Sequence, residues 1–244
     1  MERCVRCGLV YVNPRIADFE EIYEKQETML NYFLDRAATD ETAFRFPLSL
    51  IERLKPRGSV LDVGCGTGNL LLQLREKGYD CTGVELNRGC VTYGREEKGL
   101  DIRQGTVERL DFGGERFDVI TILSTLEHVG HPMQTLLRAQ SLLKEDGLLL
   151  VTVPNFRYIG FRIGKVLRMK TKTLDPTAHL FYFTLATLRA MCEKAGLRMM
   201  CGECGWVTSL RAERKVKDLV KRIIFPVSNR LEWGSTITMV LQRA

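Results

Sequence analysis

The feature that most constrains the fold of this chain is a glycine-rich turn at Val60–Gly68, which reads VLDVGCGTG. An apolar strand is predicted just before the glycines, over Ser59–Val63, and a helix just after them, over Asn69–Lys77. Glycines let the backbone turn tightly and let a ligand approach it without a Cβ atom in the way. The N-terminus of the following helix offers unpaired N–H groups and the positive end of the helix dipole. The turn therefore predicts a nucleotide-type cofactor at the carboxyl end of a parallel sheet.

Apolar runs alternate with amphipathic segments along the rest of the chain, which indicates an α/β fold with right-handed crossovers. The predicted strands are Ser59–Val63, Cys81–Glu85, Asp101–Gln104, Phe117–Leu123, Leu148–Val153, Leu197–Cys201 and Thr236–Leu241. The predicted helices are Asn69–Lys77, Arg88–Lys98, Met133–Leu143, Thr184–Ala195 and Leu210–Phe225. Residues 1–55 are expected to form an N-terminal lead-in with cap helices. Residues 56–244 are expected to form one domain with a substrate-cap insertion at about 155–183.

The spacing of the glycines distinguishes two cofactors. A dinucleotide fingerprint is G-x-G-x-x-G, and the position of its last glycine is occupied here by Asn69. Glu85 ends the second predicted strand, where a carboxylate can accept both hydrogen bonds of a ribose diol. Loop and acid together resemble the cofactor-binding motif of class I S-adenosylmethionine-dependent methyltransferases. NAD binding and a glycine turn without a ligand are the alternatives.

Later segments carry the same resemblance. Gly105–Leu110 is similar to the segment that flanks the adenine, Phe117–Val129 to the fourth strand and its exit, and Leu143–Pro154 to the turn into the fifth strand. The spacing agrees from Ser59 to Asn155 and more loosely as far as Gly196. The chain resembles the broad group that includes quinone-biosynthesis O-methyltransferases and small-molecule enzymes. The resemblance implies a seven-stranded Rossmann-like, doubly wound sheet, mostly parallel with an antiparallel last strand.

The resemblance also implies a cofactor, S-adenosyl-L-methionine, a product, S-adenosyl-L-homocysteine, and a set of contacts. The methionine part would lie against Asp62 and the loop backbone, with Leu123 and Ser124 beside it at the end of the fourth strand. Glu85 would hold the ribose, and Leu86, Val107 and Glu108 would flank the adenine. The loop residues are Gly64, Cys65, Gly66, Thr67 and Gly68.

Methyl transfer from a sulfonium is an in-line displacement that needs a base only when the nucleophile must lose a proton. Histidine suits that role near neutral pH, and the chain has three. His128 and His179 are the candidate catalytic residues. The alternatives are a His128 bonded to backbone at a helix start and a His179 that only pins the insertion. His131, before Pro132, is expected to lead into a helix.

No metal is predicted. Some quinone O-methyltransferases carry E-x-x-E-H after the fourth strand, but here the stretch begins with Ser124 and ends with Glu127 and His128. Cys4-x-x-Cys7 resembles one knuckle of a zinc ribbon, and a structural zinc needs four ligands. Cys201-x-x-Cys204 could supply the other two. Free thiols are the favoured interpretation for all eight cysteines.

The expected acceptor is a small molecule, methylated on a hydroxyl oxygen. The fourth strand ends without the N/D-P-P-Y/F pattern of enzymes that methylate base amino groups. The alternatives are an RNA-directed methyltransferase and an inactive cofactor-binding module. The net charge of +6 includes basic amphipathic segments at 156–172 and 210–225, which could contact a membrane surface peripherally. Without an apolar leader or an apolar run of about 18 residues, a cytoplasmic location is expected, with the oligomeric state open.

Overall fold

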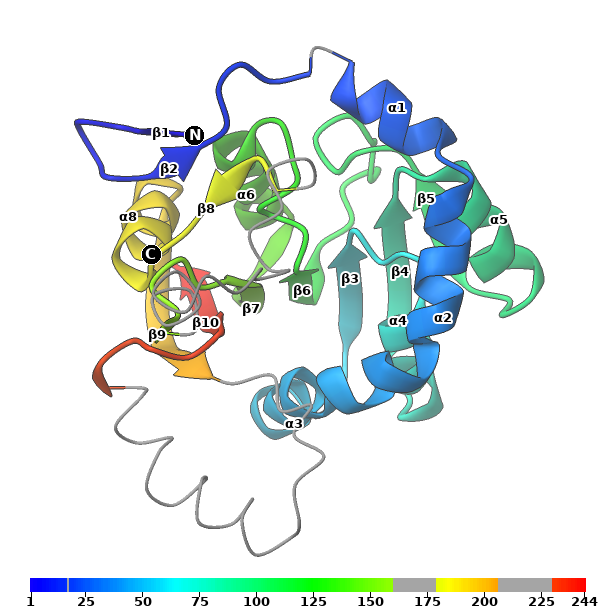
Figure 1. Ribbon diagram of the computed structural model, residues 1–244. Coiled ribbons are helices and arrows are strands. Elements are labelled where there is room, and N and C mark those ends of the chain that lie inside the picture. The colour runs from blue at the N-terminus through cyan, green and yellow to red at the C-terminus, as the bar shows by residue number, and fades with distance from the viewer. Residues whose placement is uncertain (17, 160–178, 206–229) are drawn as a thin grey trace, which may run out of the picture.

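The computed structural model describes the chain except for residues 17, 160–178 and 206–229. The described residues form a central sheet of seven strands in the order β5-β4-β3-β6-β7-β10-β9 (Figure 1). These strands are β3 (Ser59–Val63), β4 (Asp80–Glu85), β5 (Asp101–Gln104), β6 (Phe117–Leu123), β7 (Leu143–Pro154), β9 (Leu197–Gly205) and β10 (Thr236–Arg243). β10 is antiparallel to both of its neighbours, and β3 to β7 are parallel. The predicted seven-stranded, mostly parallel sheet with an antiparallel last strand is confirmed.

The strand order places the glycine turn at the topological switch point of the sheet. The chain runs outward from β3 to β4 and β5, then returns to the other side of β3 as β6. Crossovers therefore leave β3 and β6 in opposite directions, which opens a crevice at their carboxyl ends. The residues after β3 and after β6 meet at this crevice.

Helices cover both faces of the sheet because its central strands bury side chains in both directions. On β3, Leu61 belongs to a core cluster with helices α6 (Pro132–Leu142) and α8 (Leu185–Lys194). Its neighbour Val60 points the other way, into a cluster with helices α3 (Arg45–Leu54) and α4 (Asn69–Glu76). Helix α5 (Arg88–Glu96) packs beside α4 through Val91. Such near-continuous apolar strands are typical of a parallel sheet buried on both faces.

The first 55 residues form more than a lead-in and cap helices. Helices α1 (Phe19–Lys25) and α2 (Thr28–Ala43) run along the side of the sheet, and α2 contacts α4 and α5 (Figure 1). Strands β1 (Glu2–Arg3) and β2 (Val10–Tyr11) form a hairpin, and β2 pairs with β8 (Phe181–Tyr182). This small sheet joins the N-terminus to the end of the predicted insertion at 155–183. Two-residue strands carry too little periodicity to be predicted from sequence.

The other predicted elements in the described residues are confirmed, with β7 and β9 several residues longer than predicted. α8 begins after Thr184, whose side chain caps it as predicted, and Gly196 follows the helix in a left-handed conformation. The helix expected at Leu210–Phe225 lies outside the described residues, as does nearly all of the basic segment 156–172. No helix in the described part of the chain is long and apolar enough to cross a membrane.

Candidate active site

The turn after β3 requires glycine both for its backbone angles and for the space around it. Gly64 and Gly66 have φ angles of 75° and 54°, in the left-handed region that other residues adopt only with strain. A Cβ atom on Gly64 would lie 2.5 Å from Thr125 Cγ2, and one on Gly66 would lie 2.7 Å from the ring of Phe33. The loop is therefore a bare backbone surface, packed between the turn after β6 and helix α2.

Two buried carboxylates flank this loop. Asp62, on β3, accepts a hydrogen bond from the Thr121 hydroxyl at 2.6 Å, and burial raises its pKa to about 7. Glu85, at the end of β4, accepts hydrogen bonds from the backbone N–H of Gly66 at 2.9 Å and of Asn87 at 2.7 Å. Burial raises the Glu85 pKa, and the backbone N–H groups of Asn87, Gly66 and Leu86 oppose the rise. The lone pairs that remain on the carboxylate can accept ribose hydroxyls.

A lysine that sequence reasoning missed holds the loop from behind. Lys98 Nζ donates to the Thr67 carbonyl at 2.8 Å and to Asn69 Oδ1 at 2.5 Å. Thr67 is buried, and Gly68 caps the start of α4 in a left-handed conformation with φ of 78°. The ammonium thus fixes the N-terminal end of α4, but nothing in the local sequence marks Lys98 for this role.

The residues predicted to flank the adenine lie in different surroundings. Leu86 lines a cavity of about 510 Å³, together with Arg109, Glu20 and Glu24. Val107 is buried in the hydrophobic core at 1% exposure, and the Glu108 carboxylate accepts a hydrogen bond from the Thr135 hydroxyl on α6. Of the three side chains expected near the adenine, that of Leu86 is the one that lines the cavity. Val107 and Glu108 could reach a ligand only through their backbone.

The chain leaves β6 in a strained conformation. Ser124 has a φ of 51°, and its backbone N–H donates to the Thr152 carbonyl of β7 at 2.9 Å. Leu123 is half-buried and Ser124 is exposed. A non-glycine residue with positive φ is uncommon and is often found at functional sites. The turn that follows carries Thr125 against the loop, and His128 three residues further on.

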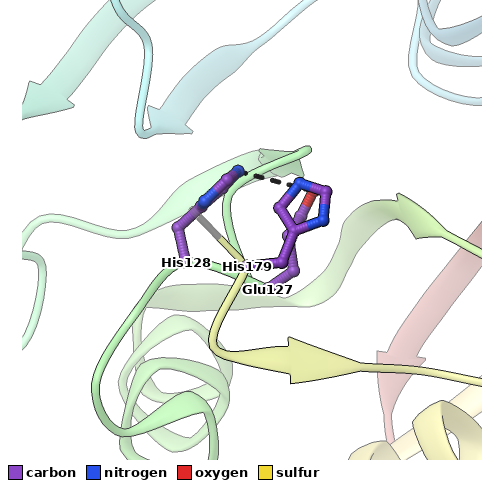
Figure 2. A group of neighbouring side chains, drawn as sticks. All are labelled: Glu127, His128 and His179. Carbon is purple, nitrogen blue, oxygen red and sulfur yellow. Dashed lines mark ion pairs between the residues drawn. The ribbon is translucent and has the colours of Figure 1, made fainter. Parts of the chain in front are cut away.

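The fold brings His128 and His179 together, although 50 residues separate them in the sequence. Their rings are 4.8 Å apart between centroids, in an edge-to-face arrangement (Figure 2). The Glu127 carbonyl accepts hydrogen bonds from the backbone N–H groups of Leu180 at 2.8 Å and Phe181 at 3.1 Å. These bonds fix the segment that carries His179 against the turn that carries His128. His131 is the N-cap residue of α6, as its predicted role in leading into a helix requires.

Glu127 is the residue of this group that sequence reasoning missed. Its side chain is 1% exposed, and burial raises its pKa to about 8. Its Oε1 lies 3.7 Å from His128 Nε2 (Figure 2), and neither carboxylate oxygen has a hydrogen-bond partner among the described residues. The sequence signal was present, since Glu127 directly precedes His128. What could not be predicted is the buried position of its carboxylate beside His179.

These three side chains offer donor atoms that all lie within 4.8 Å of one another, which is close enough to share a cation. The prediction of no metal rested on the serine at position 124, and this grouping of Glu127, His128 and His179 was not anticipated. No other group of three metal-ligand side chains occurs in the described ranges. Cys201 and Cys204 are not grouped with Cys4 and Cys7 in the described part of the chain, and none of the eight cysteines forms a disulfide.

Comparison with known proteins gives three findings. The model of a family described as a methyltransferase domain matches residues 31–201. A ubiquinone biosynthesis O-methyltransferase from Azorhizobium caulinodans is 36% identical over 112 residues, covering 44% of this chain and 44% of that protein. A protein of the same name from Actinobacillus pleuropneumoniae serotype 7 is 34% identical over 154 residues, covering 57% of this chain and 65% of that protein. The match thus spans less than two thirds of the length of either relative.

A solved structure extends the similarity of fold over most of the chain. A SAM-dependent methyltransferase from Archaeoglobus fulgidus superposes with a TM-score of 0.61 at 21% identity, covering 87% of this chain and 99% of that one. Similarity at this level of identity concerns the fold alone.

Proposed function

This chain belongs to the methyltransferase domain family, and from that premise we propose that it methylates a hydroxyl oxygen of a small-molecule acceptor. S-adenosylmethionine would supply the methyl group, already activated on its sulfonium, and S-adenosylhomocysteine would be the product. The observation that carries the proposal is the packing of the turn after β6 on the glycine loop. Thr125 lies directly against Gly64, and His128 follows in the same turn. The proposed base and the cofactor loop would therefore share the crevice at the carboxyl ends of β3 and β6.

The residues present fit this cofactor. Gly64–Gly68 form a backbone surface that a side chain would fill, and the methionine part would lie on it, with Asp62, Leu123 and Ser124 around it. Glu85 would accept the ribose hydroxyls through its remaining lone pairs. Leu86 would pack on the adenine beside the cavity that it lines. Val107 and Glu108 would contribute backbone contacts at most, because their side chains are engaged elsewhere.

His128 or His179 would take the proton from the acceptor hydroxyl. A hydroxyl oxygen becomes a strong nucleophile only as it loses its proton, and a neutral imidazole accepts that proton near pH 7. The two rings meet edge to face, 4.8 Å apart between centroids, so either imidazole could serve the same acceptor. Glu127 lies behind them, with its Oε1 3.7 Å from His128 Nε2. Because its pKa is raised to about 8, it is mostly protonated near pH 7 and would compensate the imidazolium charge only as it ionises.

The acceptor oxygen is favoured over nitrogen and carbon because two relatives are named as O-methyltransferases of ubiquinone biosynthesis. Those names favour the small-molecule interpretation over an RNA-directed enzyme. The N-terminal cap would belong to the same site. We propose that residues 1–55 cap the cofactor cleft and that the domain at 56–244 carries the chemistry, with the segment at about 155–183 shaping the acceptor pocket.

The test measures cofactor binding and turnover separately. Calorimetry with S-adenosylhomocysteine should give binding that Glu85→Ala abolishes. Transfer of a labelled methyl group should then occur to a panel of phenols and catechols and not to matched amines. His128→Ala and His179→Ala should lower kcat by about 10²-fold to 10⁴-fold with little change in cofactor Kd. His131→Ala is the matched control, because that histidine makes no side-chain cap bond on α6. Binding without turnover on any acceptor would favour an inactive binding module instead.

A further experiment, with a chelator, decides whether the two histidines act as bases or hold a cation together with Glu127. If the histidines act as bases, treatment with a chelator leaves turnover unchanged. Loss of turnover that Mg²⁺, Mn²⁺ or Zn²⁺ restores would show that the three side chains hold a cation that lowers the pKa of the acceptor hydroxyl.

A further inference from the structure

An aromatic residue of the N-terminal helices contacts the cofactor loop, although no sequence motif marks it. Phe33, on α2, covers Gly66, since its Cε1 and Cδ1 atoms lie 2.7 and 2.9 Å from where a Cβ on that glycine would be. The Phe33 ring therefore lies on the cofactor side of the cap.

Asn87 connects this cap to the cofactor site. Its Nδ2 donates to the carbonyls of Tyr23 at 2.9 Å and Gln26 at 3.0 Å, at the end of α1. Its Oδ1 accepts from the backbone N–H of Cys90 at 3.1 Å and so caps α5. Its own backbone N–H donates to the Glu85 carboxylate at 2.7 Å. At 1% exposure, this one residue joins the predicted ribose acid through its backbone, and the start of α5 to the end of α1 through its side chain.

Asn87 holds the C-terminal end of α1. The helix is seven residues long and contains no fully buried residue. A helix this short is not stable by itself in water and needs tertiary contacts. Near its start, the ion pair between Arg109 and Glu20 at 3.0 Å is one such contact. At its end, the Asn87 amide adds to the backbone N–H of Gln26, which also donates to the Tyr23 carbonyl, at 3.3 Å. The position of the turn that leads into α2 thus depends in part on Asn87.

We propose that the α1–α2 turn is part of the cofactor site, with Phe33 in contact with bound S-adenosylmethionine and Asn87 as the residue that positions the turn. The inference rests on the proposed function. The Phe33 ring would exclude water from the loop and from the nearby Glu85, and hydrogen bonds to a carboxylate are stronger where water is excluded. The cap would then close the cofactor side of the crevice and leave the histidine side to the acceptor.

The chain offers a substitution that separates the two roles of Asn87. Asn87→Asp keeps an oxygen to cap α5, since Asp and Asn are equally good N-caps, but it removes both donors to the α1 carbonyls. We expect the Kd for S-adenosylhomocysteine and the KM for S-adenosylmethionine to rise by about 10-fold or more, and kcat at saturation to change by less than about 3-fold. A merely structural role would lower active protein and kcat without raising KM.

Phe33→Ala tests the contact itself and should weaken S-adenosylhomocysteine binding by about 10-fold. Tyr32→Ala is its matched control, because Tyr32 is the neighbouring ring on the same helix and is 49% exposed. It should leave the Kd within about 2-fold. In the wild-type chain, S-adenosylhomocysteine should slow amide hydrogen exchange over residues 19–36, and in Asn87→Asp it should not.

The outcomes separate this inference from the proposed function. If the wild-type chain does not bind S-adenosylhomocysteine, the proposed function fails, and the inference fails with it. If the wild-type chain binds while Asn87→Asp and Phe33→Ala bind as tightly, only the inference is overturned. Should Asn87→Asp fail to fold, the Phe33→Ala and Tyr32→Ala pair and the wild-type exchange data decide. If Phe33→Ala and Tyr32→Ala bind S-adenosylhomocysteine with equal affinity, and the ligand does not slow amide hydrogen exchange over residues 19–36, the role of the cap is refuted.

Discussion

Replacing Asp62 by asparagine should change how the stability of the protein depends on pH. Asp62 is 5% exposed, and burial raises its pKa from the ordinary 3.8 to about 7. Between these values the folded protein holds a proton that the unfolded chain has already released. The unfolded state therefore binds fewer protons, and the free energy of unfolding falls as the pH rises through this window. Below about pH 4 and above about pH 7 the contribution of Asp62 is constant.

The size of the effect follows from the same two values. A pKa raised from 3.8 to about 7 corresponds to a loss of about 4 kcal/mol of stability across the window. That is a large part of the roughly 5–15 kcal/mol that stabilises a domain. In the Asp62→Asn variant the amide side chain is neutral at every pH, and its oxygen can still accept the Thr121 hydroxyl. The variant should therefore lack this loss and be the more stable protein at pH 8.

Urea denaturation of both proteins from pH 4 to pH 8 measures the effect, because other titrating groups cancel in the difference between them. The unfolding free energy of the wild type minus that of Asp62→Asn should fall by up to about 4 kcal/mol between pH 4 and pH 7. Thr121→Val removes the hydrogen bond that opposes the rise in pKa and should move the fall to higher pH. A difference that stays flat with pH, or one that rises, would refute the reasoning.

Three other measurements follow from the site and its surroundings. If Asp62 holds the cofactor amino group, S-adenosylhomocysteine should displace its proton at pH 6, so binding heats should differ between buffers in the wild type and agree in Asp62→Asn. The Gly64→Ala substitution should lower the free energy of unfolding by about 2–5 kcal/mol, because it adds a collision with Thr125 to an unfavourable φ. The Gly113→Ala substitution, at a φ of 56° with no atom near the new Cβ, should lower the free energy of unfolding by only about 1–2 kcal/mol. Equal losses of stability in the two variants would contradict the collision with Thr125. Thr184→Ala should cost about 1 kcal/mol in thermal unfolding through loss of the α8 cap.

The central sheet could be predicted from sequence because its strands are buried and bounded by residues that end strands. Ser59–Val63 lies between Gly58 and Gly64, and its structural bounds are those predicted. Asp101–Gln104 and Phe117–Leu123 agree in the same way. For Ser59–Val63 and Phe117–Leu123 the apolar run alone decides the element, whereas Asp101–Gln104 has one apolar residue, Ile102, and follows from the alternation of strands and helices. β7 was predicted too short, because its pairing with β6 begins at Leu143, before the apolar run starts.

Side-chain groupings that depend on distant contacts could not be predicted. Sequence reasoning selected His128 and His179 separately, and only the fold places their rings together beside Glu127. It selected Glu85 but not Asn87, whose role requires knowing where α1 ends. It expected Val107 beside the adenine, which stays a prediction, but it did not foresee that the side chain packs in the core. A motif gives the position of a residue in the chain, and a side chain's partners come from elements far along the sequence.

The position of His179 suggests how cofactor binding and acceptor choice are divided in this fold. The segment after His179 is held on one side by the Glu127 carbonyl, which accepts from Leu180 N–H at 2.8 Å. On the other side it is held by the N-terminal hairpin, because Val12 N–H donates to the Leu180 carbonyl at 3.0 Å and β2 pairs with β8. The glycine loop, by contrast, is fixed by β3, β4 and Lys98. Substitutions in the hairpin can therefore move His179 relative to His128 without disturbing the loop. We infer that the hairpin and the end of the 155–183 segment tune the acceptor side, while the parallel sheet keeps the cofactor side constant.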